Sequence, residues 1–142
     1  MITLRIEDLE LTEAWQEADP TMRERFAFPL DNRSGATSTA VVYFEVDPGH
    51  HCGRHAHSAE EVLLILEGEA ETVVGEERGR LSTGGIGLAP ANVPHDLYNA
   101  GPGTLRVVGF FPSAAVITTF DEAVAPVETR LFVMGAPPEY TA

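Results

Sequence analysis

The chain has 142 residues, a length that suits one domain and is too short for two ordinary ones. It carries 9 basic against 22 acidic residues, and the net charge of −13 disfavours nucleic acid and anionic membrane surfaces as partners. All the basic residues are arginines, which excludes enzymes that need a lysine amine, and the lone Cys52 excludes an intrachain disulfide or a cysteine-rich zinc site.

The N-terminal segment is expected to be short and partly helical. The acidic stretch Glu7–Ala18 predicts a short helix that an Asp-Pro pair ends. The next segment, Arg23–Phe28, places its arginines on one side and Glu24, Phe26 and Phe28 on the other, which indicates a strand. The first residues lack the basic and apolar regions of a secretory signal, and no apolar run is long enough to span a membrane. We therefore expect a cytoplasmic protein.

From about residue 38 to residue 112, glycines and prolines divide the chain into short β-rich runs. These runs are Thr39–Val46, Val62–Leu66, Glu71–Val74 and Leu105–Phe111. Short strands with regular turn signals indicate a sandwich or barrel rather than helices between parallel strands. A last strand is predicted at Thr129–Met134. We predict an all-β fold in which residues 1–142 form a single domain, with a core at about 39–112 and short helical or irregular flanks.

Three histidines and one glutamate are spaced as a metal site requires. His55 and His57 are two residues apart, so in a strand both imidazoles point to the same face. Glu61 follows shortly after, and His95 comes from a separate segment. Imidazole nitrogen together with carboxylate oxygen suits a divalent transition metal.

Two motifs around these residues resemble those of the cupin family. The first runs from Gly49 to Gly68 as G-x5-H-x-H-x3-E-x6-G, and every fixed position is filled at a spacing that the family uses. The second runs from Gly84 to Asn99 as G-x5-P-x-N-x2-H-x3-N, with Asn92 where the family usually has glycine. Asparagine tolerates a positive φ better than most residues, so we expect the turn to form.

The resemblance to small single-domain bacterial cupins implies a conical antiparallel β-barrel, or jelly roll, with a metal at its centre. It implies that the ligands are His55, His57, Glu61 and His95. The cofactor is then one divalent transition metal, and these ligand types accept Fe, Mn, Ni, Co, Cu or Zn. Glu61 is also expected to serve as the base that takes a substrate proton if it detaches.

Strand parity predicts the lining of the pocket around this metal. If Glu61 faces inward, alternate residues of its strand line the barrel, and the same reasoning applies to the strands of Glu45 and His95. The predicted lining residues are Phe44, Leu63, Ile65, Leu97 and Asn99. A pocket of this composition suits a small aromatic or largely apolar substrate.

The same parity makes predictions for the outer surface. Val62, Leu64 and Leu66 face outward and are apolar, so either a second subunit or the N-terminal segment covers them. We expect a homodimer, a state that is common among small cupins. His50 and His51 lie in the turn ahead of the ligand His55 and are expected to face solvent.

Three functions are compatible with this site. The first is a metal-dependent dioxygenase that resembles the quercetinase-like cupins and acts on a small hydroxyl-bearing molecule. The second is a non-redox, zinc-dependent cyclase or isomerase similar to cupin polyketide cyclases. The third is a ligand-binding cupin without catalysis. The first is the leading hypothesis, although the same ligands accept several metals and the fold does not fix the function.

Overall fold

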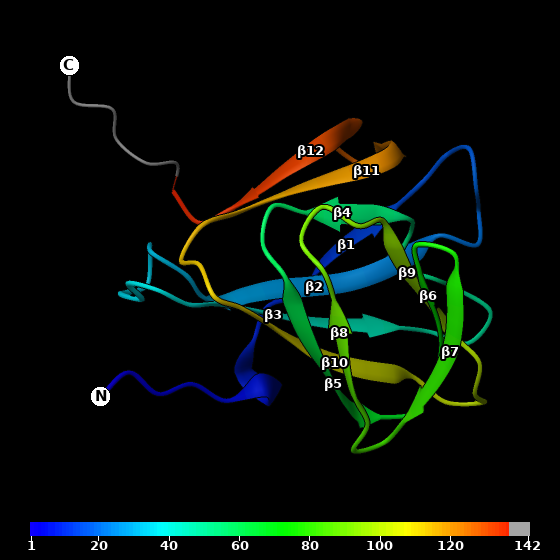
Figure 1. Ribbon diagram of the computed structural model, residues 1–142, viewed down its shortest axis with the longest axis horizontal. Helices are drawn as coiled ribbons and strands as arrows, with labels where there is room; N and C mark the ends of the chain where they lie inside the picture. Colours follow the sequence, from blue (N-terminus) through cyan, green and yellow to red (C-terminus); the bar gives the residue numbers. More distant parts are fainter. Residues whose placement is uncertain (137–142) are drawn as a thin grey trace.

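Two six-stranded sheets face each other in the computed structural model, which describes residues 1–136 (Figure 1). The first sheet has the order β1 (Thr12–Trp15), β2 (Arg23–Leu30), β3 (Ala40–Val46), β10 (Leu105–Phe111), β5 (Glu61–Glu67), β8 (Ile86–Ala89). The second has the order β12 (Thr129–Met134), β11 (Val116–Val124), β4 (His55–His57), β9 (His95–Asn99), β6 (Glu69–Val74), β7 (Glu77–Ser82). Neighbouring strands in both sheets are antiparallel. The predicted all-β jelly roll is confirmed.

The N-terminal flank differs from its prediction. The helix expected over Glu7–Ala18 is wrong, because this segment forms one 3-10 turn, η1 (Ile6–Asp8), followed by β1. Strand β1 pairs along its length with β2 and buries Ala14. Helix propensity is weak enough for such tertiary pairing to override it.

The C-terminal flank is also made of strands. Strand β12 has the bounds predicted for the last strand, and it pairs with β11. Strand β11 in turn pairs with β4, which carries two of the predicted ligands. The flanks therefore widen both sheets at the same side of the barrel, with β1 and β2 at the edge of one sheet and β11 and β12 at the edge of the other (Figure 1).

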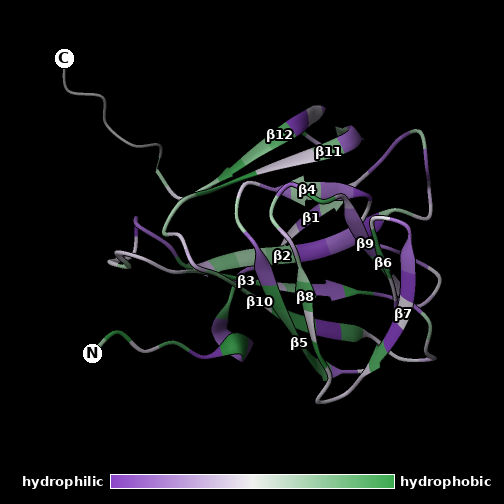
Figure 2. Ribbon diagram, in the orientation of Figure 1, coloured by the Kyte–Doolittle hydropathy of each residue, from purple (hydrophilic) through white to green (hydrophobic). Residues whose placement is uncertain are grey.

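The core lies between the sheets and follows the predicted alternation of side chains. In β3, Val42, Phe44 and Val46 are buried on the inner face, and in β5 the residues Leu63 and Ile65 are buried in the same way. Figure 2 shows hydrophobic residues concentrated on β3, β5 and β10. Within the described residues, no helix is long and apolar enough to cross a membrane.

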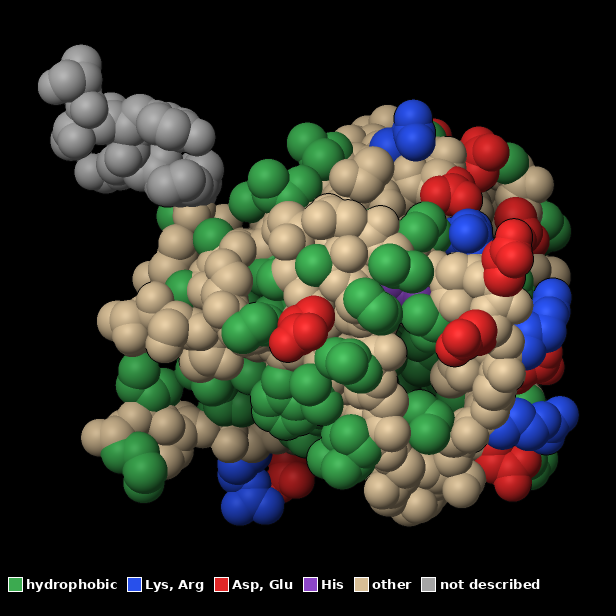
Figure 3. Space-filling view, in the orientation of Figure 1, with side chains coloured by type: hydrophobic (Ala, Val, Ile, Leu, Met, Phe, Trp, Pro, Cys, Tyr) green, Lys and Arg blue, Asp and Glu red, His purple; other side chains and the backbone are tan. Residues whose placement is uncertain are grey.

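The outer face of β10, β5 and β8 is apolar as well. Phe110 pairs with Val62, which pairs with Leu88, and the three side chains are between 39% and 54% exposed. Ile86, two residues before Leu88 in β8, is 69% exposed. Figure 3 shows hydrophobic side chains gathered over this face. The structure thus confirms the outward apolar row expected for β5.

Candidate metal centre

Three buried histidines from two neighbouring strands converge between the sheets. His55 and His57 project from the same face of β4, and His95 lies opposite His55 in β9. One ring nitrogen of each histidine lies within 4.8 Å of the others, so the three could hold one metal ion. The strand pairing itself sets this geometry, because a two-residue spacing and a cross-strand pair place all three imidazoles on one face.

Glu61 reaches the same point from the opposite sheet. Its Oε1 atom lies 3.3 Å from Nε2 of His57 and 3.3 Å from Nε2 of His95. Two ligands bonded to one metal at about 2.1 Å and at right angles lie about 3 Å apart, which matches these separations. Gly109 on β10 leaves room for the carboxylate, because a Cβ atom at this position would overlap Glu61 and would lie 2.9 Å from Cγ1 of Val42.

The other ring nitrogen of each histidine is already engaged. Nδ1 of His55 lies 2.6 Å from the Gly53 carbonyl, Nδ1 of His95 lies 3.0 Å from the Val93 carbonyl, and Nδ1 of His57 lies 2.7 Å from Oγ1 of Thr118. A carbonyl only accepts, so Nδ1 of His55 and of His95 carries the hydrogen and leaves Nε2 with a free lone pair.

Two buried atoms of the site have no hydrogen-bond partner among the described residues. They are Nε2 of His57 and Nε2 of His95, which both face Glu61. Native proteins seldom leave buried polar atoms unsatisfied, and a metal ion bound between these atoms and the carboxylate would satisfy them. The donor set of neutral imidazoles and a carboxylate therefore fits a divalent transition metal.

The electrostatics of the site favour this protonation state. Burial, together with the neighbouring His95 and His57, holds the pKa of His55 well below its ordinary value. Burial alone would raise the pKa of Glu61, but the close approach of His57 and His95 outweighs burial and holds it at about 2. A neutral imidazole and an ionised carboxylate are the forms that bind a metal.

The turn that presents His95 forms as the second motif predicts. Asn92 adopts a φ of 62°, and its backbone N–H donates to the His57 carbonyl over 2.7 Å. Asparagine therefore takes the left-handed conformation for which the family usually has glycine. The same hydrogen bond ties the second motif to the strand that carries the first two histidines.

The structure corrects the prediction for one of the two histidines in the turn ahead of His55. His51 is buried, with its ring nitrogens 2.8 Å from Asp19 and 2.7 Å from Asp96. Its ring also stacks on Tyr98 at a centroid distance of 4.5 Å. The prediction of a solvent-facing His51 fails because Thr21 and Arg23 hydrogen-bond to the backbone of His51 and Asp19 contacts its ring, which strand parity alone does not show.

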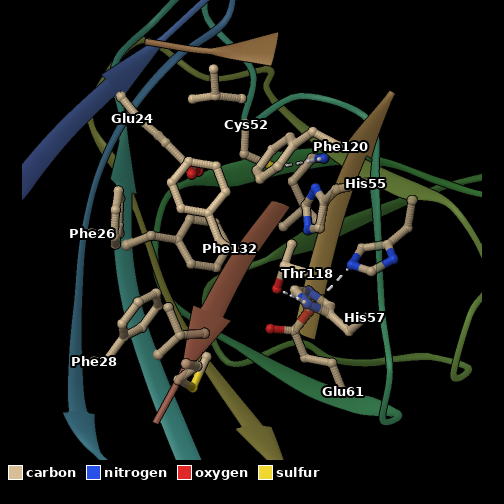
Figure 4. Close-up of a pocket in the computed structure, with 17 residues that line it drawn as sticks. Glu24, Phe26, Phe28, Cys52, His55, His57, Glu61, Thr118, Phe120 and Phe132 are labelled. Carbon is tan, nitrogen blue, oxygen red and sulfur yellow. Dashed lines mark hydrogen bonds and ion pairs between the residues drawn. The ribbon is translucent and has the colours of Figure 1, made fainter. Parts of the chain in front are cut away.

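An apolar cavity opens beside the three histidines. Figure 4 shows His55, His57 and Glu61 on one side of it and Glu24, Phe26 and Phe28 on the other. Five phenylalanines dominate its lining, namely Phe26, Phe28, Phe44, Phe120 and Phe132. The chemistry of this lining suits a small aromatic molecule.

The predicted lining residues fall in three places. Phe44 and Leu97 line this cavity, whereas Leu63 lines a second cavity that shares His95 and Leu97 with the first. Ile65 and Asn99 are buried but line neither cavity. Asn99 is instead structural, because its side-chain amide donates to the carbonyls of Val46 and Gly103 over 2.8 and 2.7 Å.

Sequence reasoning missed the contribution of the flanks to this cavity. Thr118 and Phe120 come from β11, and Phe132 comes from β12. The alternation of Glu24, Phe26 and Phe28 in the sequence indicated a strand with a common face, but not what that face would meet. Nothing in the sequence identified Thr118 as the partner of a ligand.

Comparison with known proteins agrees with this geometry. The family profile described as "Cupin domain" matches residues 42–111. A search of curated protein sequences found no match. Structures with the same fold include the polyketide cyclase RemF from Streptomyces resistomycificus, with a TM-score of 0.63 and 22% identity over 79% of each chain.

Two further solved structures share the fold. A proposed sugar phosphate isomerase from Acidithiobacillus ferrooxidans has a TM-score of 0.63 and 16% identity, over 81% of this chain and 76% of that one. The oxalate decarboxylase from Lactobacillus farciminis has a TM-score of 0.70 and 20% identity, over 82% of this chain. This chain spans only 34% of that decarboxylase. At these identities the likeness establishes the fold and no activity.

Proposed function

We propose, from the premise that this chain carries a cupin domain, that it is a metal-dependent enzyme of the dioxygenase type. Its substrate would be a small aromatic molecule that bears a hydroxyl group. The observation that carries the proposal is the pair of unsatisfied Nε2 atoms of His57 and His95, buried beside a cavity lined by phenylalanines. A metal held there faces an apolar, phenylalanine-lined space.

The ligands in this proposal are His55, His57 and His95, with Glu61 as the fourth. Three or four protein ligands leave positions open on a six-coordinate metal. A redox-active divalent metal, when bound, supplies positive charge that acidifies a substrate hydroxyl and the electron transfer that dioxygen chemistry needs.

The protein's own residues would orient the reactants. The phenylalanine walls would hold an aromatic ring and exclude water from the centre. Thr118 and the carbonyls of Gly53 and Val93 would fix the direction of the three imidazoles. Glu61, if it detaches, is placed to take the proton of the substrate hydroxyl.

A second candidate is a non-redox cyclase that uses zinc. The similarity to RemF favours it, because that structure matches 79% of each chain and is a polyketide cyclase. An aromatic cavity suits a polyketide as well as it suits a flavonoid-like molecule. The two candidates share the site and differ in the metal and in the need for dioxygen.

The test begins with elemental analysis of protein purified without chelator, in the wild type, His55→Ala and His95→Ala. We expect about one metal per wild-type chain and a large loss in both variants, with the barrel still folded by circular dichroism. The matched control is His50→Ala, which changes a histidine outside the cluster and should keep its metal. Full occupancy in His55→Ala and His95→Ala would contradict the site.

Oxygen uptake with aromatic hydroxyl compounds then separates the candidate functions. Consumption of dioxygen that depends on iron, manganese, nickel, cobalt or copper would support the dioxygenase. Zinc at full occupancy, with product formed under nitrogen, would support the cyclase. A protein that takes up no metal on reconstitution would be a ligand-binding cupin, and both enzyme proposals would be wrong.

A further inference from the structure

A carboxyl group lies in the aromatic cavity away from the three histidines. Glu24 belongs to β2 and lines the cavity together with Phe26 and Phe28, which share its face of the strand. The intervening arginines point the other way, where Arg23 pairs with Glu13 on the surface. Glu24 therefore faces inward because of strand alternation, not because an inner partner attracts it.

No hydrogen bond or ion pair from the Glu24 side chain occurs within residues 1–136. Other acids of low exposure do have partners, as Asp31 has Arg33 and Asp96 has His51. Glu24 is half-buried, so its carboxyl group meets either water or a ligand at the surface of the cavity. An unpartnered carboxyl that opens on an apolar cavity is therefore a group for which a ligand can supply the partner.

The protonation state of Glu24 suits such a contact. Burial, followed by the negative charges of Asp96 and Glu61, raises the pKa of Glu24 to about 8, although His51 acts in the opposite direction. At neutral pH the side chain is then mostly a neutral carboxylic acid. In that form it can donate one hydrogen bond and accept others, and it imposes no net charge on an aromatic ligand.

Glu24 and the metal centre lie on opposite sides of the cavity. Figure 4 shows Glu24 and Phe26 facing His55 and Glu61 across the space, with the ring of Phe132 beside it. An aromatic molecule placed between the phenylalanines would have one edge near the histidines and the other near Glu24. The cavity is apolar except at these two ends, so a ligand that fills it should carry a polar group at each end.

We propose that Glu24 is a substrate-recognition residue that hydrogen-bonds an oxygen function on the far edge of an aromatic substrate. This inference rests on the proposed function, since it places the near edge of the same substrate at the metal. It narrows the substrate class to planar aromatic molecules with oxygen functions, hydroxyl or carbonyl, at two opposite ends. A substrate with a single oxygen function would leave Glu24 without a partner.

The test compares two probes that differ only at the far end, 2-naphthol and 2,6-dihydroxynaphthalene. Their affinities for the zinc-loaded protein are measured under nitrogen, so that no turnover interferes. In the wild type we expect the diol to bind about fivefold more tightly than naphthol, the usual effect of one added hydrogen bond. Glu24→Leu should abolish this preference, so that the diol and naphthol bind equally well, and should leave the affinity for naphthol unchanged.

Two control variants separate recognition from general effects. Glu24→Gln keeps a neutral hydrogen-bonding group of the same size, so it should keep most of the ratio. Glu13→Leu removes an exposed acid from the neighbouring strand and should keep all of it. An equal ratio in the wild type and Glu24→Leu, or no preference for the diol in the wild type, would overturn the assignment of Glu24.

The same measurements tell this failure from a failure of the proposed function. Naphthol that binds equally well to zinc-loaded wild type and to metal-free His55→Ala would contradict the proposed role of the metal. In that case the ratio of diol to naphthol affinity in Glu24→Leu would still show whether Glu24 recognises the far end of the probe. If neither probe binds any form of the protein, both the aromatic substrate and the role of Glu24 are wrong.

Discussion

Replacing Glu24 with glutamine should make the protein more stable at neutral pH and should change the pH dependence of its stability. The folded state raises the pKa of Glu24 from 4.5 to about 8. Between these two values the unfolded chain releases the proton more readily than the folded chain does, so the free energy of unfolding falls as the pH rises. Below pH 4.5 Glu24 is protonated in both the folded and the unfolded state, and above about pH 8 the free energy of unfolding falls no further on account of Glu24.

The magnitude follows from the width of this interval. Within this interval each pH unit lowers the free energy of unfolding by about 1.4 kcal/mol, so by pH 7 that free energy has fallen by about 3 kcal/mol. Glu24 is only half-buried and keeps part of its hydration, which reduces the loss to between about 1 and 3 kcal/mol. Glutamine has no proton to lose, so Glu24→Gln should regain this amount at pH 7 and nothing at pH 4.5.

Urea unfolding followed by the fluorescence of Trp15, the single tryptophan, measures the effect at several pH values from 4.5 to 8. The informative quantity is the difference in unfolding free energy between Glu24→Gln and wild type, because contributions from other groups largely cancel in it. That difference should grow with pH. If the curve for Glu24→Gln were flat, Glu24 would ionise normally and the reasoning would be refuted.

Two further changes test other parts of the structure. Thr118→Val removes the hydrogen-bond partner of Nδ1 of His57 and should weaken metal binding about tenfold in a competition assay with a chelator. The control Thr119→Val, on the exposed face of the same strand, should leave metal affinity unchanged. Val62→Asp places a charge in the apolar outer face and should convert the predicted homodimer into a 15.3 kDa monomer in sedimentation equilibrium. The control Val133→Asp, at another exposed site, should leave the dimer intact. A monomeric wild type would contradict the predicted dimer.

The sequence contained enough information for the barrel and for the convergence of the histidines. Glycines and prolines marked the turns, and side-chain alternation assigned the two faces of β3 and β5. The spacing of His55 and His57 required a common face, and strand pairing then brought His95 opposite His55. These are local rules of period two, so they hold before any tertiary contact is known.

The features that sequence reasoning missed depend on contacts between distant segments. Thr118 meets His57 because β11 pairs with β4, a pairing separated by 61 residues along the chain. His51 is buried because residues 21–23 pair with its backbone, and no periodicity in the sequence signals that pairing. The N-terminal helix failed for the same reason, since β1 exists through its pairing with β2.

The cavity joins two parts of the chain that differ in how far they could be predicted. The region matched by the cupin profile contributes the three histidines and Glu61. Most of the remaining lining comes from outside that region, including Glu24, Phe26 and Phe28 before it and Phe120 and Phe132 after it. A shared fold and a shared metal site can therefore accompany different substrates, because the residues that would contact the far end of a substrate belong to the flanks. The flank residues, and Glu24 first among them, are accordingly where substitutions should change which aromatic molecule binds without changing which metal does.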